Sequence, residues 1–172
     1  MRLLTSAEAS TLLATRGLKI GAWNELVDLD SAKAAHRQCV APADTRTLIS
    51  FARSLLEWLC PQQCKWIILQ IDNSTAPLLS EPAVFQFLAM PDLKNNWDVG
   101  TQRTFMFNVE DTDDGNQAVF KTRLSMLIFI ALAFEWHVHF ACDTGAVGQR
   151  LALLDGVAYL FGPENSIRAF QT

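Results

Sequence analysis

Four carboxylates lie within five residues of this chain, at Glu110, Asp111, Asp113 and Asp114. Oxygen ligands at this density could hold a hard cation such as calcium. A calcium loop with Asp114 at its fifth position needs a bidentate glutamate at its twelfth, where this chain has Lys121. The register therefore argues against a calcium site.

The same acidic run can begin a helix or face a positively charged partner. Carboxylates at a helix N-terminus accept hydrogen bonds from free amides and interact favourably with the helix dipole. Asp113 and Asp114 stand where a long apolar segment begins, and no Lys or Arg lies between Arg103 and Lys121. Capping uses one or two carboxylates, so the two preceding acidic residues are not needed for the cap. The run therefore predicts a helix cap and, beside it, an acidic docking surface for a basic partner.

A second candidate is the pair His137 and His139, with Cys142 close behind them. On a strand, both histidines share a face with Ala141 and Asp143, whereas Cys142 lies on the other face. A zinc site needs four ligands around one centre, whereas this strand directs the histidines and the cysteine to opposite faces. We expect the histidines to lie toward solvent or an outer helix, with no metal or other cofactor. A small enzyme or metal-binding protein that uses both histidines is the alternative.

Motifs for other chemistry are missing from the sequence. It has no Gly-x-Ser-x-Gly elbow and no cysteine-protease signature, and Gly145 and Gly148 lack the Lys-Ser/Thr of a phosphate-binding loop. The net charge is −4, and residues 61–172 hold seven Lys and Arg against twelve Asp and Glu. That balance disfavours nucleic acid and suits a basic protein partner. We therefore expect a protein that is not an enzyme.

Length and composition indicate one domain over residues 1–172. Half of the residues are hydrophobic and 19% are charged, which is typical of a globular protein with a sizeable core. The apolar run 124–134 is too short to cross a bilayer, which takes about 20 residues. The first residues include no apolar secretory segment, and a domain of this size needs no disulfides. We expect a cytoplasmic protein with reduced thiols and no membrane contact.

The hydrophobic periodicity predicts an α+β fold. Residues 18–30 fit a strand or a short helix, and residues 36–40 fit a short extended segment. Together the elements predict a largely antiparallel sheet of about five strands with three to four packed helices. The helices are expected at 5–17, 44–60, 80–90 and 116–134, and the strands at 65–72, 103–110, 136–143, 151–154 and 157–161.

The C-terminal strands form a predicted β-hairpin, because Asp155-Gly156 is the strongest turn signal in the chain. Both faces of this hairpin are apolar, so the second face is either covered by helices or free for a partner. Arg150, Tyr159 and Phe161 lie on that second face, and Arg and Tyr are favoured in interfaces. We predict these three residues and the acidic run as the partner-binding set. The expected cross-strand pairs are Leu154 with Val157, Ala152 with Tyr159, and Arg150 with Phe161.

Residues 105–114, 137–145 and 151–162 make the chain similar to the immunity proteins of bacterial polymorphic toxin systems, of the contact-dependent growth inhibition type. The similarity is one of character, a small acidic α+β domain with a buried helix and a C-terminal hairpin. It involves no shared motif, so it assigns no functional residue. The resemblance implies a protein that binds a cognate toxin, often a basic nuclease, and blocks its active site or its access to a target. A self-associating structural subunit, joined through the second hairpin face, is a further alternative.

Overall fold

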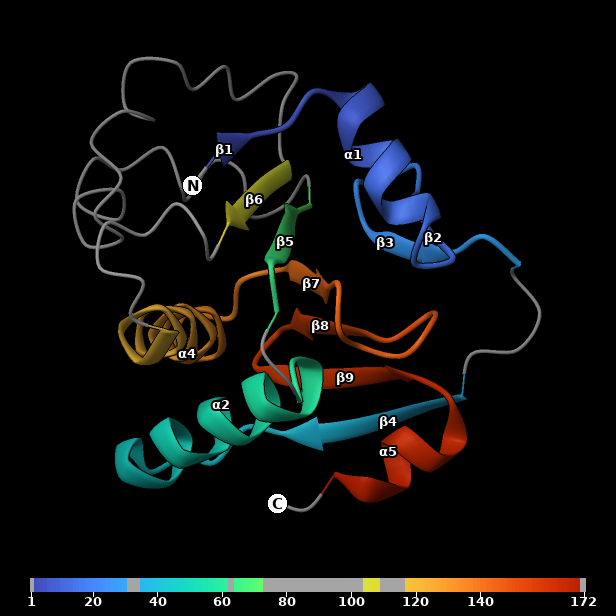
Figure 1. Ribbon diagram of the computed structural model, residues 1–172. Coiled ribbons are helices and arrows are strands. Elements are labelled where there is room, and N and C mark those ends of the chain that lie inside the picture. The colour runs from blue at the N-terminus through green and yellow to red at the C-terminus, as the bar shows by residue number, and fades with distance from the viewer. Residues whose placement is uncertain (1, 31–34, 62–63, 73–103, 109–116, 171–172) are drawn as a thin grey trace.

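The computed structural model describes residues 2–30, 35–61, 64–72, 104–108 and 117–170. Its centre is an antiparallel sheet with the strand order β1-β6-β5-β7-β8-β9-β4 (Figure 1). The predicted α+β class and antiparallel sheet are confirmed, although the sheet has seven strands rather than about five. Its strands are β1 (Arg2–Leu3), β4 (Ala35–Val40), β5 (Trp66–Ile71), β6 (Thr104–Asn108), β7 (Val138–Cys142), β8 (Arg150–Leu154) and β9 (Val157–Gly162).

Three helices pack on one face of this sheet: α2 (Thr45–Leu59), α4 (Gln117–Ala133) and α5 (Glu164–Ala169). Helix α2 begins where the sequence predicts, because the Asp44 carboxylate accepts hydrogen bonds from the backbone amides of Arg46 and Thr47. Helix α5 follows Pro163 and was not predicted. Its six residues are too few to show a helical period.

The main core lies between these helices and the sheet. Alternate residues of β5, β7, β8 and β9 point into it, so each strand contributes every second side chain. The predicted inward residues Phe105 and Phe107 of β6 are buried there. All four cysteines are buried and free, as expected.

The opposite face of the sheet carries a smaller cover. Helix α1 (Ser6–Ala14) and an antiparallel pair, β2 (Leu18–Ile20) with β3 (Leu26–Asp28), pack on Ile68 of β5 and Ala141 of β7. The helix predicted at 5–17 begins with a capping box, in which the Thr5 side chain accepts from the amide of Glu8 and the Glu8 side chain accepts from the amide of Thr5. Residues 18–30, for which strand or helix was left open, therefore contain a small β-hairpin that lies with α1 over part of this face (Figure 1).

The C-terminal hairpin has the register that the sequence predicts. Leu154 pairs with Val157, and both turn residues, Asp155 and Gly156, have positive φ angles of 51° and 73°. These angles are typical of a two-residue turn of type I′. Confirmation of this register fixes Arg150, Tyr159 and Phe161 on one face of the sheet.

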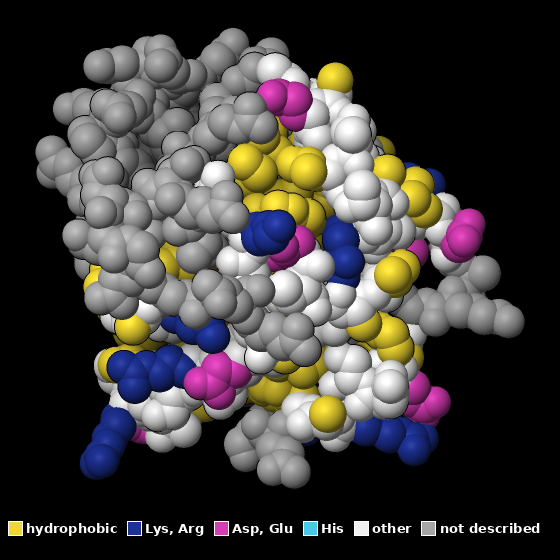
Figure 2. Space-filling model, viewed as in Figure 1, with side chains coloured by type: hydrophobic (Ala, Val, Ile, Leu, Met, Phe, Trp, Pro, Cys, Tyr) yellow, Lys and Arg dark blue, Asp and Glu magenta, His cyan; other side chains and the backbone are white. Residues whose placement is uncertain are grey.

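Two sequence predictions lie outside the described residues: the helix at 80–90 and the acidic run with its helix cap at 110–114. In the described part of the chain, no helix is long and apolar enough to cross a membrane. On the side shown in Figure 2, the described acidic and basic side chains are interspersed, without a large area of either charge.

Candidate protein-binding face and the histidine site beside it

Helix α1 and the β2–β3 hairpin leave part of this sheet face uncovered. That part is built by β8, β9 and β4. Four apolar side chains of the C-terminal hairpin are only half-buried there, although they belong to central strands. The next strand, β4, adds His36, Gln38 and Val40, all exposed. An apolar sheet face that no described element covers is typical of a partner-binding surface. We call it the open face; its half-buried apolar residues are Leu154, Val157, Tyr159 and Phe161.

Aromatic rings form the middle of the open face. Tyr159 and Phe161 stack with their ring centroids 6.5 Å apart, and His36 lies 5.8 Å from Phe161 on the neighbouring strand. Tyr and Phe are rigid and large, so they provide contact area at a low cost in conformational entropy. Two of the predicted partner-binding residues are therefore adjacent and partly exposed.

Arg150, the third predicted residue of the hairpin, lies beneath this surface rather than on it. Its side chain is 6% exposed, and its guanidinium donates to Asp28 Oδ1 at 2.9 Å. The guanidinium carbon also lies 4.1 Å from the ring centroid of Phe161, a cation–π contact. Burial lowers the pKa of Arg150, and the charge of Asp28 opposes that shift. Arg150 therefore positions Phe161 and ties β3 to β8.

A pocket of about 320 Å³ adjoins the open face where β9 ends. Asp28 and the exposed Asp30 supply carboxylates to it, and none of its lining residues is Lys, Arg or His. Asp28 is already paired with Arg150, so Asp30 is the carboxylate that this pocket leaves for a Lys or Arg side chain. Its lining residues are Gly17, Asp28, Leu29, Asp30, Val147, Gly148, Gly162 and Pro163.

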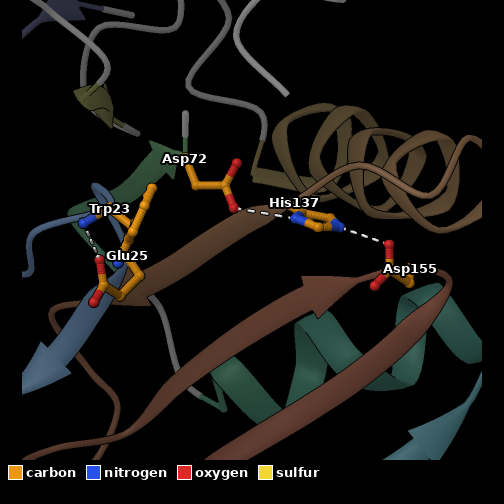
Figure 3. Close-up of polar contacts among 5 residues, drawn as sticks. All are labelled: Trp23, Glu25, Asp72, His137 and Asp155. Carbon is orange, nitrogen blue, oxygen red and sulfur yellow. Dashed lines mark hydrogen bonds and ion pairs between the residues drawn. The ribbon is translucent and has the colours of Figure 1, made fainter. Parts of the chain in front are cut away.

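His137 lies at the other end of the hairpin, between two carboxylates (Figure 3). Its Nδ1 is 3.2 Å from Asp72 Oδ2, at the end of β5, and its Nε2 is 2.7 Å from Asp155 Oδ1, in the β8–β9 turn. Burial lowers the pKa of His137, but the hydrogen bond with Asp155 and the charge of Asp72 outweigh it and raise the pKa overall. The His137 ring thus connects the end of β5 to the β8–β9 turn.

His139 is buried, so solvent is excluded for it from the two predicted alternatives, solvent or an outer helix. It is 5% exposed, and neither ring nitrogen has a hydrogen-bond partner among the described residues. Its neighbours in register are Gln70 and Ala152, both buried. Burial lowers the pKa of His139 to about 4, more than the charges of Asp72 and Glu25 raise it. His139 is therefore neutral at physiological pH.

The two histidines do not form a site together. A general acid or base needs a nitrogen that can reach the substrate, and both nitrogens of His137 already contact carboxylates. No group of three His, Cys, Asp or Glu within the described ranges is placed to hold a metal ion. The described geometry gives His137 the role of an ion-paired link. One feature of the sequence bears on this contact, because Asp155 belongs to the predicted β-turn.

A third group of ionisable side chains lies on the helix-covered side of the sheet. Cys60, Cys64 and Cys142 are buried there, and the backbone amide of Gly145 donates to Cys142 Sγ at 3.2 Å. Hydrogen bonding with Cys60, the largest effect, lowers the pKa of Cys142 to about 7. The Cys142 thiol is also 2.9 Å from the carbonyl oxygen of Leu59, so it connects β7 to the end of α2.

Replacement of Asp155 by asparagine should weaken the link through His137. Asn-Gly forms the same turn as Asp-Gly, so the hairpin should remain, but the ring of His137 loses one negative neighbour. We expect the pKa of His137 to fall toward its ordinary value, and Asp155 is 80% exposed, so stability should change little. A titration of the His137 ring signals by NMR measures this shift. An unchanged pKa would show that Asp72 alone sets it.

No protein-family model, curated protein or solved structure matches this chain.

Proposed function

We propose that this chain is a non-enzymatic protein-binding domain of the immunity-protein type, which binds a cognate bacterial toxin in the cytoplasm and neutralises it. The observation that carries the proposal is the open face, where partly exposed aromatic side chains lie next to an acidic pocket. An enzyme would need a reactive group with access to substrate, and of the two candidate histidines His137 is paired with carboxylates and His139 is buried.

The chemistry of the open face suits a partner with basic side chains. Tyr159 and Phe161 are aromatic residues of the kind enriched at interface centres, and the pocket beside them offers the exposed Asp30 to a Lys or Arg. Complementary charge accelerates encounter, and desolvated anchors slow dissociation. The acids at 110, 111, 113 and 114 stay a predicted part of the same binding set.

The decisive test uses the protein encoded next to this chain in its genome. The C-terminal domain of the protein encoded immediately upstream is expressed in a bacterial host, with and without this chain. We expect growth arrest alone, rescue on co-expression, and a complex that copurifies. An upstream gene for a metabolic enzyme, or a toxic domain that this chain neither rescues nor binds, would overturn the proposal.

Truncation of Tyr159 should weaken that complex without unfolding the protein. The ring is half-buried on the open face, so Tyr159→Ala should raise Kd by at least about tenfold, chiefly through faster dissociation. Surface plasmon resonance with the purified toxin domain measures both rates. Val119→Ala, on the outer side of α4 and 39% exposed, is the matched control and should leave both rates unchanged. Equal affinities of the two variants would remove the open face from the binding site.

A further inference from the structure

Strand β4 forms one edge of the sheet, and its second side has no partner among the described residues. All six of its residues pair with β9 on the inner side, from Ala35 with Gly162 to Val40 with Val157. The opposite edge strand, β1, has only two residues. Natural sheets usually shorten or block their edges, because free backbone groups pair with other chains. In Figure 1, β4 is the long, open edge.

The hydrogen-bond register identifies which backbone groups point outward. In an antiparallel ladder, residues alternate between those bonded to the neighbouring strand and those pointing away from it. The amide of Ala41 donates to the carbonyl of Gly156 at 3.1 Å, and Val40 lies opposite Val157. The odd-numbered residues from 35 to 41 therefore bond to β9. The N–H and C=O groups of His36, Gln38 and Val40 point away from the sheet.

The side chains of β4 do not protect this edge. The strand contains no Lys and no Pro, the usual blocking residues. Its one charged residue, Arg37, is turned to the helix side, where it donates to the carbonyl of Phe170 at 2.7 Å and lies over that ring. Val40 is 78% exposed. The edge is thus uncharged on the open face, and its outward donors and acceptors have no partner among the described residues.

We propose that a second copy of this chain pairs with β4 across a two-fold axis, antiparallel and centred on Gln38. Gln38 then lies opposite the partner's Gln38, and His36 lies opposite the partner's Val40. Every outward N–H and C=O of the three residues finds a partner in this register. On the helix side, Arg37 lies opposite the partner's Cys39, so no like charges oppose each other.

The commitment to a second copy rests on this self-complementarity. A two-fold interface requires one surface to match itself, and β4 does so in its outward hydrogen-bonding groups and in charge. The pairing also joins the open faces of both copies into one continuous surface, which carries Tyr159 and Phe161 twice. It is independent of toxin binding, since it uses the backbone of β4 rather than the aromatic residues.

The test uses Gln38→Pro, which removes one outward-pointing N–H. Proline is tolerated in edge strands at positions whose N–H faces solvent, so the ladder with β9 should stay intact. Gln38→Ala, which keeps the N–H, is the matched control. In sedimentation velocity over a dilution series, we expect the wild type and Gln38→Ala to form dimers. Gln38→Pro should dissociate at a concentration at least about a hundredfold higher, since it loses central hydrogen bonds of the pair.

A wild-type chain that is monomeric at every concentration would overturn the proposal, even if a different protein pairs with β4. Equal dimerisation of Gln38→Pro and Gln38→Ala would overturn it as well. Circular dichroism checks that both variants fold. If the proline variant does not fold, hydrogen exchange on the wild type decides. The amides of His36, Gln38 and Val40 should be protected at dimer concentrations and exchange freely on dilution; free exchange at all concentrations contradicts the pairing.

Discussion

Arg150→Ala is expected to lower the free energy of unfolding by about 3 kcal/mol, because it removes one partner of a buried ion pair. Arg150 is 6% exposed and Asp28 is 18% exposed, so Asp28 would be left in a largely dry site without its cation. The substitution also removes the cation–π contact with Phe161. Urea unfolding measures the change. The expected consequence for the structure is a looser attachment of β3 to β8.

A double-mutant cycle separates the ion pair from other effects of truncation. Asp28→Leu combined with Arg150→Met should restore most of the lost stability, because an apolar pair of similar volume needs no charge compensation. The control is Arg168→Ala, which breaks the exposed ion pair with Glu164 one turn away on α5. That change should cost only about 0.5 kcal/mol. Equal losses for Arg150→Ala and Arg168→Ala would contradict a structural role for the buried pair.

The parts of the fold that could be predicted are those with local causes. Asp155-Gly156 needs positive φ at both positions, and it thereby fixed the register of the C-terminal hairpin in advance. Thr5, Glu8 and Asp44 satisfy amides within their own first turns, so the starts of α1 and α2 could be read directly. These signals involve residues a few positions apart.

The parts that could not be predicted depend on distant partners. Asp28 and Arg150 are 122 positions apart, and nothing local to either residue indicates the pairing. Strand β4 escaped clear prediction because its open-face side chains are all exposed and two of the three are polar, which hides the alternation of a buried strand. The same reason explains why fewer strands were predicted than the sheet contains. Edge strands show the weakest burial pattern in any sheet.

The candidate site was predicted in part. The alternation of the hairpin placed Arg150, Tyr159 and Phe161 on one face, and the structure confirms that placement. The alternation could not show that the Arg150 guanidinium is buried while the two aromatic rings stay partly exposed. This difference arises because the β2–β3 hairpin, which contributes Asp28, covers only one end of this face. For His139, the strand pattern gave the correct face but could not decide between solvent and a covering element. The cover over that face comes from residues more than a hundred positions earlier.

His139→Leu should make the protein more stable than the wild type at acid pH. His139 has a pKa of about 4 in the folded protein against 6.5 in the unfolded chain. Between these values the unfolded chain binds a proton that the folded protein does not, so wild-type stability falls as the pH decreases. The pKa difference corresponds to about 3 kcal/mol between pH 7 and pH 4. The leucine variant lacks this loss and also removes a buried polar ring without hydrogen-bond partners.

Urea unfolding of both proteins at a series of pH values measures the difference. Contributions that both proteins share cancel in it, including that of His137, whose raised pKa acts in the opposite direction by stabilising the fold at low pH. His36→Leu is the control, since His36 is exposed on β4 and its replacement should alter stability little at any pH. A stability difference between His139→Leu and wild type that stays constant from pH 7 to pH 4 would contradict the burial of a neutral imidazole. A growing difference would identify His139 as a residue that limits the acid stability of this fold.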